Sequence, residues 1–494
     1  MPLRDKKSER YSGVLCAISS LPSVYGIGSL GIEAYRFVDF LSEAKQHFWQ
    51  ILPLNPLGEG NSPYKSSSTF AGEILYIDLD FLVRDGLLSA DAIGRCDFAQ
   101  NVDYNAVRKF KLPLLQKAAE CFDTSNKNYK KFLNDNDFWI DDYAIFEAAL
   151  KVYQIQRLTQ LPDGIKYRVP DALDKFKKSY ECEINFYKIT QYFFFCQYYE
   201  LRRYANQKGV KIIGDIPFYV SPDSADVWGN PDDFKVGRDF TPTVVAGVPP
   251  DVFSKDGQLW GNPIYNWENL RQNEYRWWLV RLGFCRDMYD VLRIDHFRAF
   301  ANYYQIPCGS KSAVTGAWVC GEGAMFWDKT RDTIGEINII AEDLGGEEDP
   351  DVISLLKHTD FPNMRILQFG FTSNMNNPFL PQNYTYNSVC YTGTHDNDTS
   401  LGWYNSATTK QRVMFNTIVR NNANCVSHDM IRELSKSQSK LCIIPMQDLL
   451  CLDSNARMNT PGTTKGNWQW RMSKDDINKD NAKLLKKLTK ERNK

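Results

Sequence analysis

Several features that would point to particular classes of protein are missing from this 494-residue sequence. Its 59 lysines and arginines are balanced by 60 aspartates and glutamates, so no basic excess attracts nucleic acid or an anionic membrane. No apolar run is long enough to span a bilayer, and the polar N-terminus MPLRDKKSERYSG lacks the apolar core of a secretion signal. We therefore expect a cytoplasmic, globular protein with no nucleic-acid partner and no membrane partner.

Motifs for several kinds of catalysis are also missing. The chain has no Gly-x-Ser-x-Gly elbow for a serine nucleophile and no GxxxxGK[ST] phosphate loop. Its five histidines are too few, and too widely spaced, for a dinuclear metal hydrolase. His395 and Asp396 resemble an HD metal pair without the partners it needs, so we expect no metal site and keep a metal-dependent hydrolase as an alternative.

The twelve cysteines contain no CxxC pair. Cys16, Cys390, Cys442 and Cys451 lie in or beside apolar, strand-like runs. Free cysteine is among the most buried residue types, and disulfides are rare in the cytosol. We therefore expect buried free thiols rather than disulfides or a zinc site.

Eight short, β-rich apolar runs are present, and helical patterns lie between several of them. Uninterrupted apolar runs are typical of parallel strands that are covered on both faces. Eight strand–helix units predict an α/β fold, a (β/α)₈ TIM barrel. A doubly wound open sheet is the alternative, although the first run is followed by SSLPSVY (Ser19–Tyr25) and not by a glycine-rich nucleotide turn. The runs are 13–19, 48–54, 211–216, 291–295, 337–342, 364–369, 389–392 and 441–445.

The uneven spacing of these runs predicts how the domain is elaborated. We expect residues 1–494 to form one catalytic barrel domain with additions. Residues 57–205, between the second and third strands, contain helical patterns with charged faces and predict an inserted, mostly helical subdomain. Residues 217–273 are rich in proline, glycine, aspartate and tryptophan and show no helical period. They predict a long active-site loop over the C-terminal face of the barrel.

Acidic residues follow four of the predicted strands. Asp215, Asp295 and Glu342 end their runs, and Asp396 follows VCYTGTH. One acid after a strand commonly caps a helix or turn. A barrel directs all its strand ends to one mouth, so four acids there would converge and perturb one another.

Glycoside chemistry is the reaction class that fits convergent carboxylates best, because it needs a nucleophile and a general acid/base around one anomeric carbon. Arg293 lies two residues before Asp295, on the same face of a strand, and would keep that carboxylate ionised; a purely structural ion pair is equally compatible with this spacing. Apolar neighbours would raise the pKa of Glu342 toward that of a general acid, unless Glu342 instead pairs with an arginine. Three tryptophans lie in the long loop: Trp228, Trp260 and Trp267. They could stack on sugar rings or pack the loop against the rest of the protein.

Several longer segments carry a resemblance to amylomaltases, the 4-α-glucanotransferases of the α-amylase clan. The resemblance runs in order from about Ser12 to Arg471, which is nearly the whole chain. Two departures are Ala17, where the family has histidine, and Glu59, where it often has an aromatic residue. The matching segments are WQILPLNP (49–56), SPY (62–64), GDIPFYV (214–220), GVPPDVFSKDGQLWGNP (247–263), RIDHFR (293–298), AEDLG (341–345), GTHDNDT (393–399), NTPG (459–462) and NWQWR (467–471).

The resemblance implies a (β/α)₈ barrel with inserted helical subdomains, no C-terminal β-sandwich and no cofactor. It implies a retaining transfer of α-1,4-glucan segments to the 4-hydroxyl of an acceptor, with maltooligosaccharides and α-1,4-glucans as partners. On matching positions, Asp295 would be the nucleophile, Glu342 the acid/base and Asp396 the transition-state stabiliser. The residues implied to bind substrate are Tyr64, Asp215, Trp260, Arg293, His296, His395 and Asn459. An α-1,4-glucan hydrolase of the same clan and a non-catalytic glucan-binding protein remain alternatives.

Overall fold

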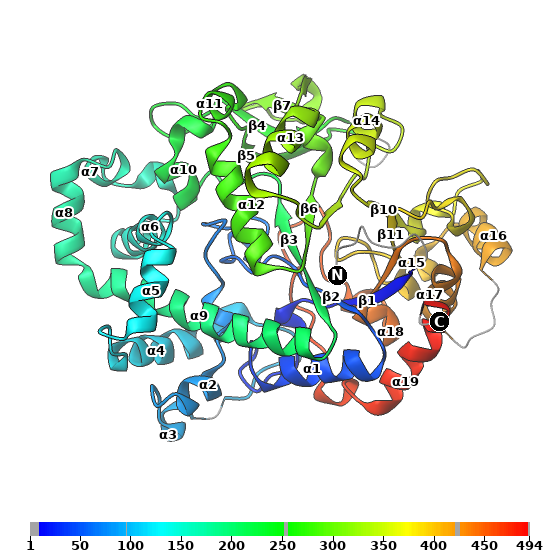
Figure 1. The fold of residues 1–494 in the computed structure, drawn as a ribbon, viewed down its shortest axis with the longest axis horizontal. Helices are drawn as coiled ribbons and strands as arrows, with labels where there is room; N and C mark the ends of the chain where they lie inside the picture. Colours follow the sequence, from blue (N-terminus) through cyan, green and yellow to red (C-terminus); the bar gives the residue numbers. More distant parts are fainter. Residues whose placement is uncertain (1–8, 95, 251–254, 420–424, 493–494) are drawn as a thin grey trace.

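A closed barrel of parallel strands forms the centre of the molecule (Figure 1). The computed structural model describes residues 9–94, 96–250, 255–419 and 425–492. Around the barrel the strands follow the order β1-β12-β11-β10-β9-β6-β3-β2, and β1 closes the ring by pairing with both β12 and β2. In chain order they are β1 (Tyr11–Leu15), β2 (Phe48–Gln50), β3 (Lys211–Pro217), β6 (Val291–Asp295), β9 (Ile339–Ala341), β10 (Asn363–Ile366), β11 (Ser388–Tyr391) and β12 (Leu441–Pro445).

Every barrel strand overlaps one of the apolar runs seen in the sequence, so the prediction of a TIM barrel is confirmed and an open sheet is excluded. The strands are buried almost throughout, since side chains fill the barrel interior and helices cover its outer surface. Among the described helices none is both long and apolar enough to cross a membrane. The α-helices that lie wholly or partly outside residues 57–205 and 217–273 are α1 (Ile32–Glu43), α9 (Glu181–Gln207), α12 (Arg276–Met288), α13 (Gly323–Ile334), α14 (Pro350–Thr359), α15 (Ser400–Ser406), α16 (Thr409–Ile418), α17 (Val426–Lys436), α18 (Met446–Leu449) and α19 (Lys479–Leu488).

A group of helices between β2 and β3 lies to one side of the barrel, at the left of Figure 1. Both α4 and α6 pack against the long helix α9, which leads back into β3. The buried ammonium of Lys111 on α4 donates hydrogen bonds to the carbonyl oxygens of Leu75 and Ile77, and so attaches α4 to the segment just before α2. Its members are α2 (Leu79–Arg84), α3 (Ala90–Ile93), α4 (Tyr104–Cys121), α5 (Lys127–Asp135), α6 (Ile140–Tyr153), α7 (Asp163–Lys166) and α8 (Pro170–Ser179).

The segment 217–273 is not the irregular loop that its composition suggests. It contains α10 (Ala225–Gly229), β4 (Val244–Val248), β5 (Gln258–Pro263) and α11 (Trp267–Gln272), while residues 251–254 lie outside the described residues. Its strands join β7 (Asn302–Pro307) and β8 (Ala317–Cys320) in a second sheet of order β5-β4-β7-β8. Because β4 pairs with β7, more than fifty residues later, local sequence patterns do not reveal this sheet.

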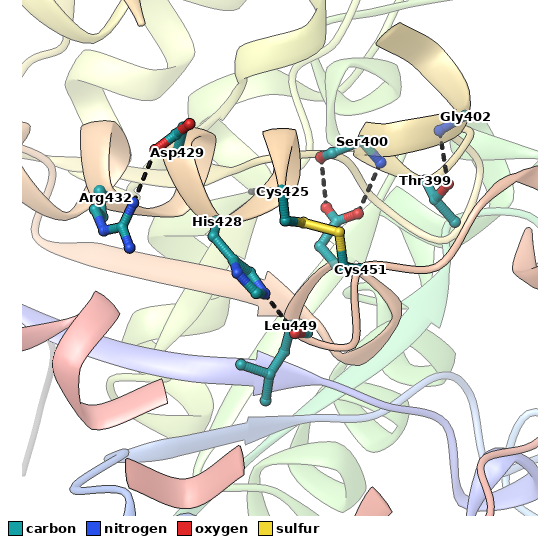
Figure 2. Close-up of a disulfide and its surroundings, with 10 residues drawn as sticks. Thr399, Ser400, Gly402, Cys425, His428, Asp429, Arg432, Leu449 and Cys451 are labelled. Atoms are coloured by element: carbon teal, nitrogen blue, oxygen red, sulfur yellow. Dashed lines mark hydrogen bonds and ion pairs between the residues drawn. A yellow bond between two sulfur atoms is a disulfide. The ribbon is translucent and has the colours of Figure 1, made fainter. Parts of the chain in front are cut away.

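The expectation that the cysteines are unpaired is wrong for two of them. Cys425, just before α17, forms a disulfide with Cys451 in the turn after α18, 26 residues further along the chain (Figure 2). Only the folded chain brings their Cα atoms to 6.3 Å, so no short motif announces the pair. Free and buried thiols are found at Cys16, Cys285, Cys390 and Cys442, and free, exposed thiols at Cys96, Cys121, Cys182, Cys196, Cys308 and Cys320.

Candidate active site

The C-terminal mouth of the barrel opens into a cavity of about 960 Å³. Parallel strands place their carboxyl ends on one side, and it is here that the predicted site residues meet. Seven of the ten line the cavity: Tyr64, Trp260, Asp295, His296, His395, Asp396 and Asn459. The other three, Asp215, Arg293 and Glu342, lie directly behind, and each is hydrogen-bonded to a lining residue.

A buried ion-pair chain supports Asp295 at the end of β6. Arg293 donates through Nη1 to both carboxylate oxygens of Asp215, at 2.7 and 2.8 Å, and through Nη2 to Oδ1 of Asp295 at 2.8 Å. In the register of β3 and β6, Asp215 faces Arg293, so the sheet itself sets this geometry. Burial raises the pKa of Asp295, while the Arg293 guanidinium opposes that rise and favours the ionised carboxylate. The Arg293–Asp295 pair expected from the sequence is therefore present.

Asp215 differs from the prediction that it contacts sugar. Its side chain is 0% exposed, and its carboxylate already accepts two hydrogen bonds from Arg293 and one from the Tyr64 hydroxyl at 2.7 Å. The strand continues two residues beyond it to Pro217, which places Asp215 below the floor of the cavity and not at its surface. It is placed to hold Arg293 and Tyr64.

Glu342 directly follows β9 and is held by backbone groups rather than by an arginine. One carboxylate oxygen accepts from the His296 backbone N–H at 2.6 Å, and the other accepts from the Leu344 N–H at 3.1 Å. Burial, and then the charge of Asp295, raise the pKa of Glu342 to about 8. The site therefore holds one carboxyl group that favours the protonated form beside one that is paired with a guanidinium, as an acid and a nucleophile require.

His296 projects into the cavity from a strained backbone position. Its φ of 55° lies in the left-handed region, and its ring meets Trp260 edge to face with 4.8 Å between centroids. Burial lowers the pKa of His296 to about 3, so the imidazole is neutral at physiological pH. Its Nε2 atom is buried without a hydrogen-bond partner, which leaves a free polar group for a ligand hydroxyl.

Asp396 and His395, which follow β11, also line the cavity. His395 stacks on Tyr64, with ring centroids 5.1 Å apart and planes 14° from parallel. Asp396 is 41% exposed and accepts a hydrogen bond from the Asn459 amide at 2.6 Å. Asn459 thus touches a predicted catalytic carboxylate as well as the cavity.

The loop tryptophans divide between the two roles left open by the sequence. Trp260 is half-buried at the cavity. Trp228 is fully buried and its indole N–H donates to the Ile165 carbonyl, and Trp267 packs against Trp278, so these two are packing residues. The sequence reading missed Trp468, whose ring lies 5.8 Å from Tyr64 and lines the cavity. Its place in NWQWR was the available signal.

At the rim, Glu59 and Lys65 form an exposed ion pair of 2.9 Å, and both line the cavity. A charged pair therefore occupies the position where an aromatic side chain would offer a sugar platform. Among the described residues, no group of three or more histidine, cysteine, aspartate or glutamate side chains is arranged to hold a metal ion.

Known proteins match nearly the whole chain. A family model described as 4-alpha-glucanotransferase matches residues 16–477. Over 479 residues the sequence is 45% identical to a 4-alpha-glucanotransferase of Streptococcus pneumoniae, covering 95% of this chain and 94% of the relative. A second such relative, from Clostridium butyricum, is 40% identical over 481 residues, covering 96% and 98% of the two chains.

Solved structures of amylomaltases are similar to this chain along nearly its whole length. The amylomaltase of Streptococcus agalactiae in complex with acarbose superposes with a TM-score of 0.94 at 40% identity, covering 98% of this chain and 100% of that one. The amylomaltase of Corynebacterium glutamicum, at 18% identity and a TM-score of 0.76, shares the fold over 98% of this chain and 75% of its own.

Proposed function

The chain belongs to the 4-alpha-glucanotransferase family, and from that premise we propose how its residues divide the transfer reaction between them. It is a retaining 4-alpha-glucanotransferase, which moves an α-1,4-glucan segment from a donor to the 4-hydroxyl of an acceptor. Maltooligosaccharides are the donors and acceptors that we propose for it. The cleft at the barrel mouth is where we place both.

Glu342 and Asp295 carry the first step. Glu342, with its pKa raised to about 8, protonates the glycosidic oxygen as the bond breaks. Asp295, held ionised by Arg293, attacks the anomeric carbon and forms a covalent glycosyl ester. The released fragment then leaves through the open mouth of the cleft.

The second step reverses these roles. Glu342, now a carboxylate, removes the proton from the acceptor 4-hydroxyl, and the acceptor oxygen displaces Asp295. Two inversions at one carbon give net retention. When water takes the place of the acceptor the outcome is hydrolysis, so covering of the cleft by residues 217–273 favours transfer.

The remaining residues hold the reacting glucose unit. We propose that Asp396 stabilises positive charge on the sugar ring in the transition state. His296, His395 and Asn459 offer polar atoms to its hydroxyls, while Trp260 and Tyr64 supply apolar faces. Arg293 and Asp215 act one step behind, by holding Asp295 and Tyr64 in place.

The wider organisation supports this role. We propose that residues 1–494 act as one catalytic domain in which the helices of residues 57–205 form a subdomain beside the cleft and residues 217–273 form one wall of it. We also propose a cytoplasmic location, in which the Cys425–Cys451 disulfide must persist against reducing thiols.

The observation that carries this assignment is that Asp295 pairs with a guanidinium while Glu342, beside it, does not. Product analysis with maltotriose tests the reaction: free glucose together with longer maltodextrins is the expected result. Release of only glucose and maltose would show a hydrolase. Asp295→Ala is expected to abolish turnover with the fold retained, and substantial residual activity would refute its role as nucleophile.

A further inference from the structure

Asp396 is the one proposed catalytic carboxylate that no strand positions. Asp295 is the last residue of β6 and Glu342 directly follows β9, whereas Asp396 comes five residues after the end of β11. Its side chain is also 41% exposed, so packing restrains it little. Polar contacts therefore hold it in the cleft: local ones, from its N–H to the Thr394 hydroxyl at 3.3 Å and from its carboxylate to His395 Nε2 at 3.5 Å, and others from a segment later in the chain.

The guanidinium of Arg457 connects Asp396 to Asn459. Arg457 donates through Nη2 to the Asp396 carbonyl oxygen at 2.7 Å and through Nε to the Asn459 carbonyl oxygen at 2.8 Å. Asn459 in turn donates from its amide to the Asp396 carboxylate at 2.6 Å, and from its backbone N–H to the His395 carbonyl at 3.0 Å. Arg457, Asp396 and Asn459 thus form a closed ring of hydrogen bonds that fixes both the backbone and the carboxylate of Asp396.

The segment that carries Arg457 is itself anchored close by. The Ser454 hydroxyl donates to the Asp398 carboxylate at 2.7 Å, and the Met458 carbonyl accepts from the Trp468 backbone N–H at 2.7 Å. Arg457 is half-buried between these two anchors. The segment that holds Arg457 is therefore tethered on both sides of this residue.

We propose that Arg457 is a positioning residue for the transfer reaction: it sets the placement of Asp396, and it touches neither donor nor acceptor. This inference rests on the proposed role of Asp396 as transition-state stabiliser. A displacement of about 1 Å at a reacting centre costs about 100-fold in rate. Because the interaction is strongest in the transition state, loss of Arg457 lowers kcat and leaves KM nearly unchanged.

The test compares initial rates of glucose release from maltotriose. For Arg457→Ala we expect kcat to fall by about 100-fold, with KM within about threefold of the parent. Arg457→Lys should recover little, because an ammonium lacks the planar fork that reaches two carbonyl oxygens. Added guanidinium ion at low millimolar concentration should restore part of the kcat of Arg457→Ala.

A matched control is available in α16. Arg412 also donates to two carbonyl oxygens, those of Tyr404 and Asn405, but its side chain is exposed and is not among the residues that line the cavity. Arg412→Ala should leave kcat and KM unchanged. Equal kcat for Arg457→Ala and the parent enzyme, or a loss carried mainly by KM, would overturn the inference.

A double-mutant cycle separates this inference from the role of Asp396. With α-maltosyl fluoride as an activated donor, Asp396→Asn and the double variant with Arg457→Ala should have the same kcat, because Arg457 acts through Asp396. If Arg457→Ala lowers kcat in the Asp396→Asn background by as much as it does in the parent enzyme, the positioning role is refuted. Full activity of Asp396→Asn would refute the proposed function of Asp396. If Asp396→Asn is inactive and Arg457→Ala is fully active, only the positioning role of Arg457 is refuted. If Arg457→Ala does not fold, the Lys variant, which keeps the stem, enters the same cycle.

Discussion

Replacing Asp215 with alanine removes a carboxylate that is 0% exposed and accepts three hydrogen bonds. Two come from the Arg293 guanidinium, at 2.7 and 2.8 Å, and one comes from the Tyr64 hydroxyl at 2.7 Å. In the variant, Arg293 keeps only its bond to Asp295, and its side chain is buried, at 4% exposed. Removing one partner of a buried ion pair costs about 3–5 kcal/mol, and we expect the free energy of unfolding to fall by that amount.

The assay is equilibrium urea unfolding followed by tryptophan fluorescence, with turnover of maltotriose measured on the same preparations. Asp135→Ala is the matched control, because it breaks an ion pair with Lys131 in which the side chains are 48% and 73% exposed. Screening by water limits that loss to about 1 kcal/mol or less. Equal losses for the two variants would refute the reasoning that burial determines the cost. Unchanged kcat in Asp215→Ala would show that Arg293 needs no anchor to orient Asp295.

Three other perturbations test different parts of the molecule. The pKa of Glu342 is raised to about 8 and its protonated form is the acid, so kcat/KM should fall as pH rises through about 8. Glu342→Gln should lose nearly all turnover. A kcat/KM of the parent enzyme that stays flat at alkaline pH would contradict this role. The disulfide between Cys425 and Cys451 closes a 26-residue separation (Figure 2). Cys425→Ser should therefore lower the free energy of unfolding by about 3.5 kcal/mol. Dithiothreitol should lower the free energy of unfolding of the parent enzyme by the same amount and leave that of the variant unchanged. The exposed free thiol Cys182 provides the control, since its replacement by serine should change stability by about 0.5 kcal/mol or less. Trp260→Ala should raise KM for maltotriose about tenfold through lost sugar stacking, whereas an unchanged KM would remove Trp260 from the binding surface.

The barrel was predictable from the sequence because its signal is local. A parallel strand covered on both faces is apolar along most of its length, and the eight runs show this directly. The second sheet was not predictable in the same way. Its strands β4 and β7 pair across a long sequence separation, and β5 carries partly exposed side chains, so neither an apolar run nor a clear alternation marks it.

The site shows the same division. Asp295 and Glu342 could be located because each stands where an apolar strand ends, and the longer motifs pointed to Asp396. Asp215 stands two residues before its strand ends, and only the structure shows that it is fully buried beneath Arg293. The partners of Asp396 could not be inferred either, because Arg457 and Asn459 lie some sixty residues further along the chain and reach it through a loop.

The sequence by itself therefore determined the barrel and the reaction class and pointed to the acidic residues that we propose for it, since each of these signals is a pattern a few residues long. Tertiary structure alone decided which groups are buried, which carboxyl group faces a guanidinium, which cysteines meet and which loop holds Asp396. Those properties depend on distances between segments that are remote in the chain. Burial and ion pairing change pKa values and side-chain geometry only when folding brings these segments together and removes the water between them.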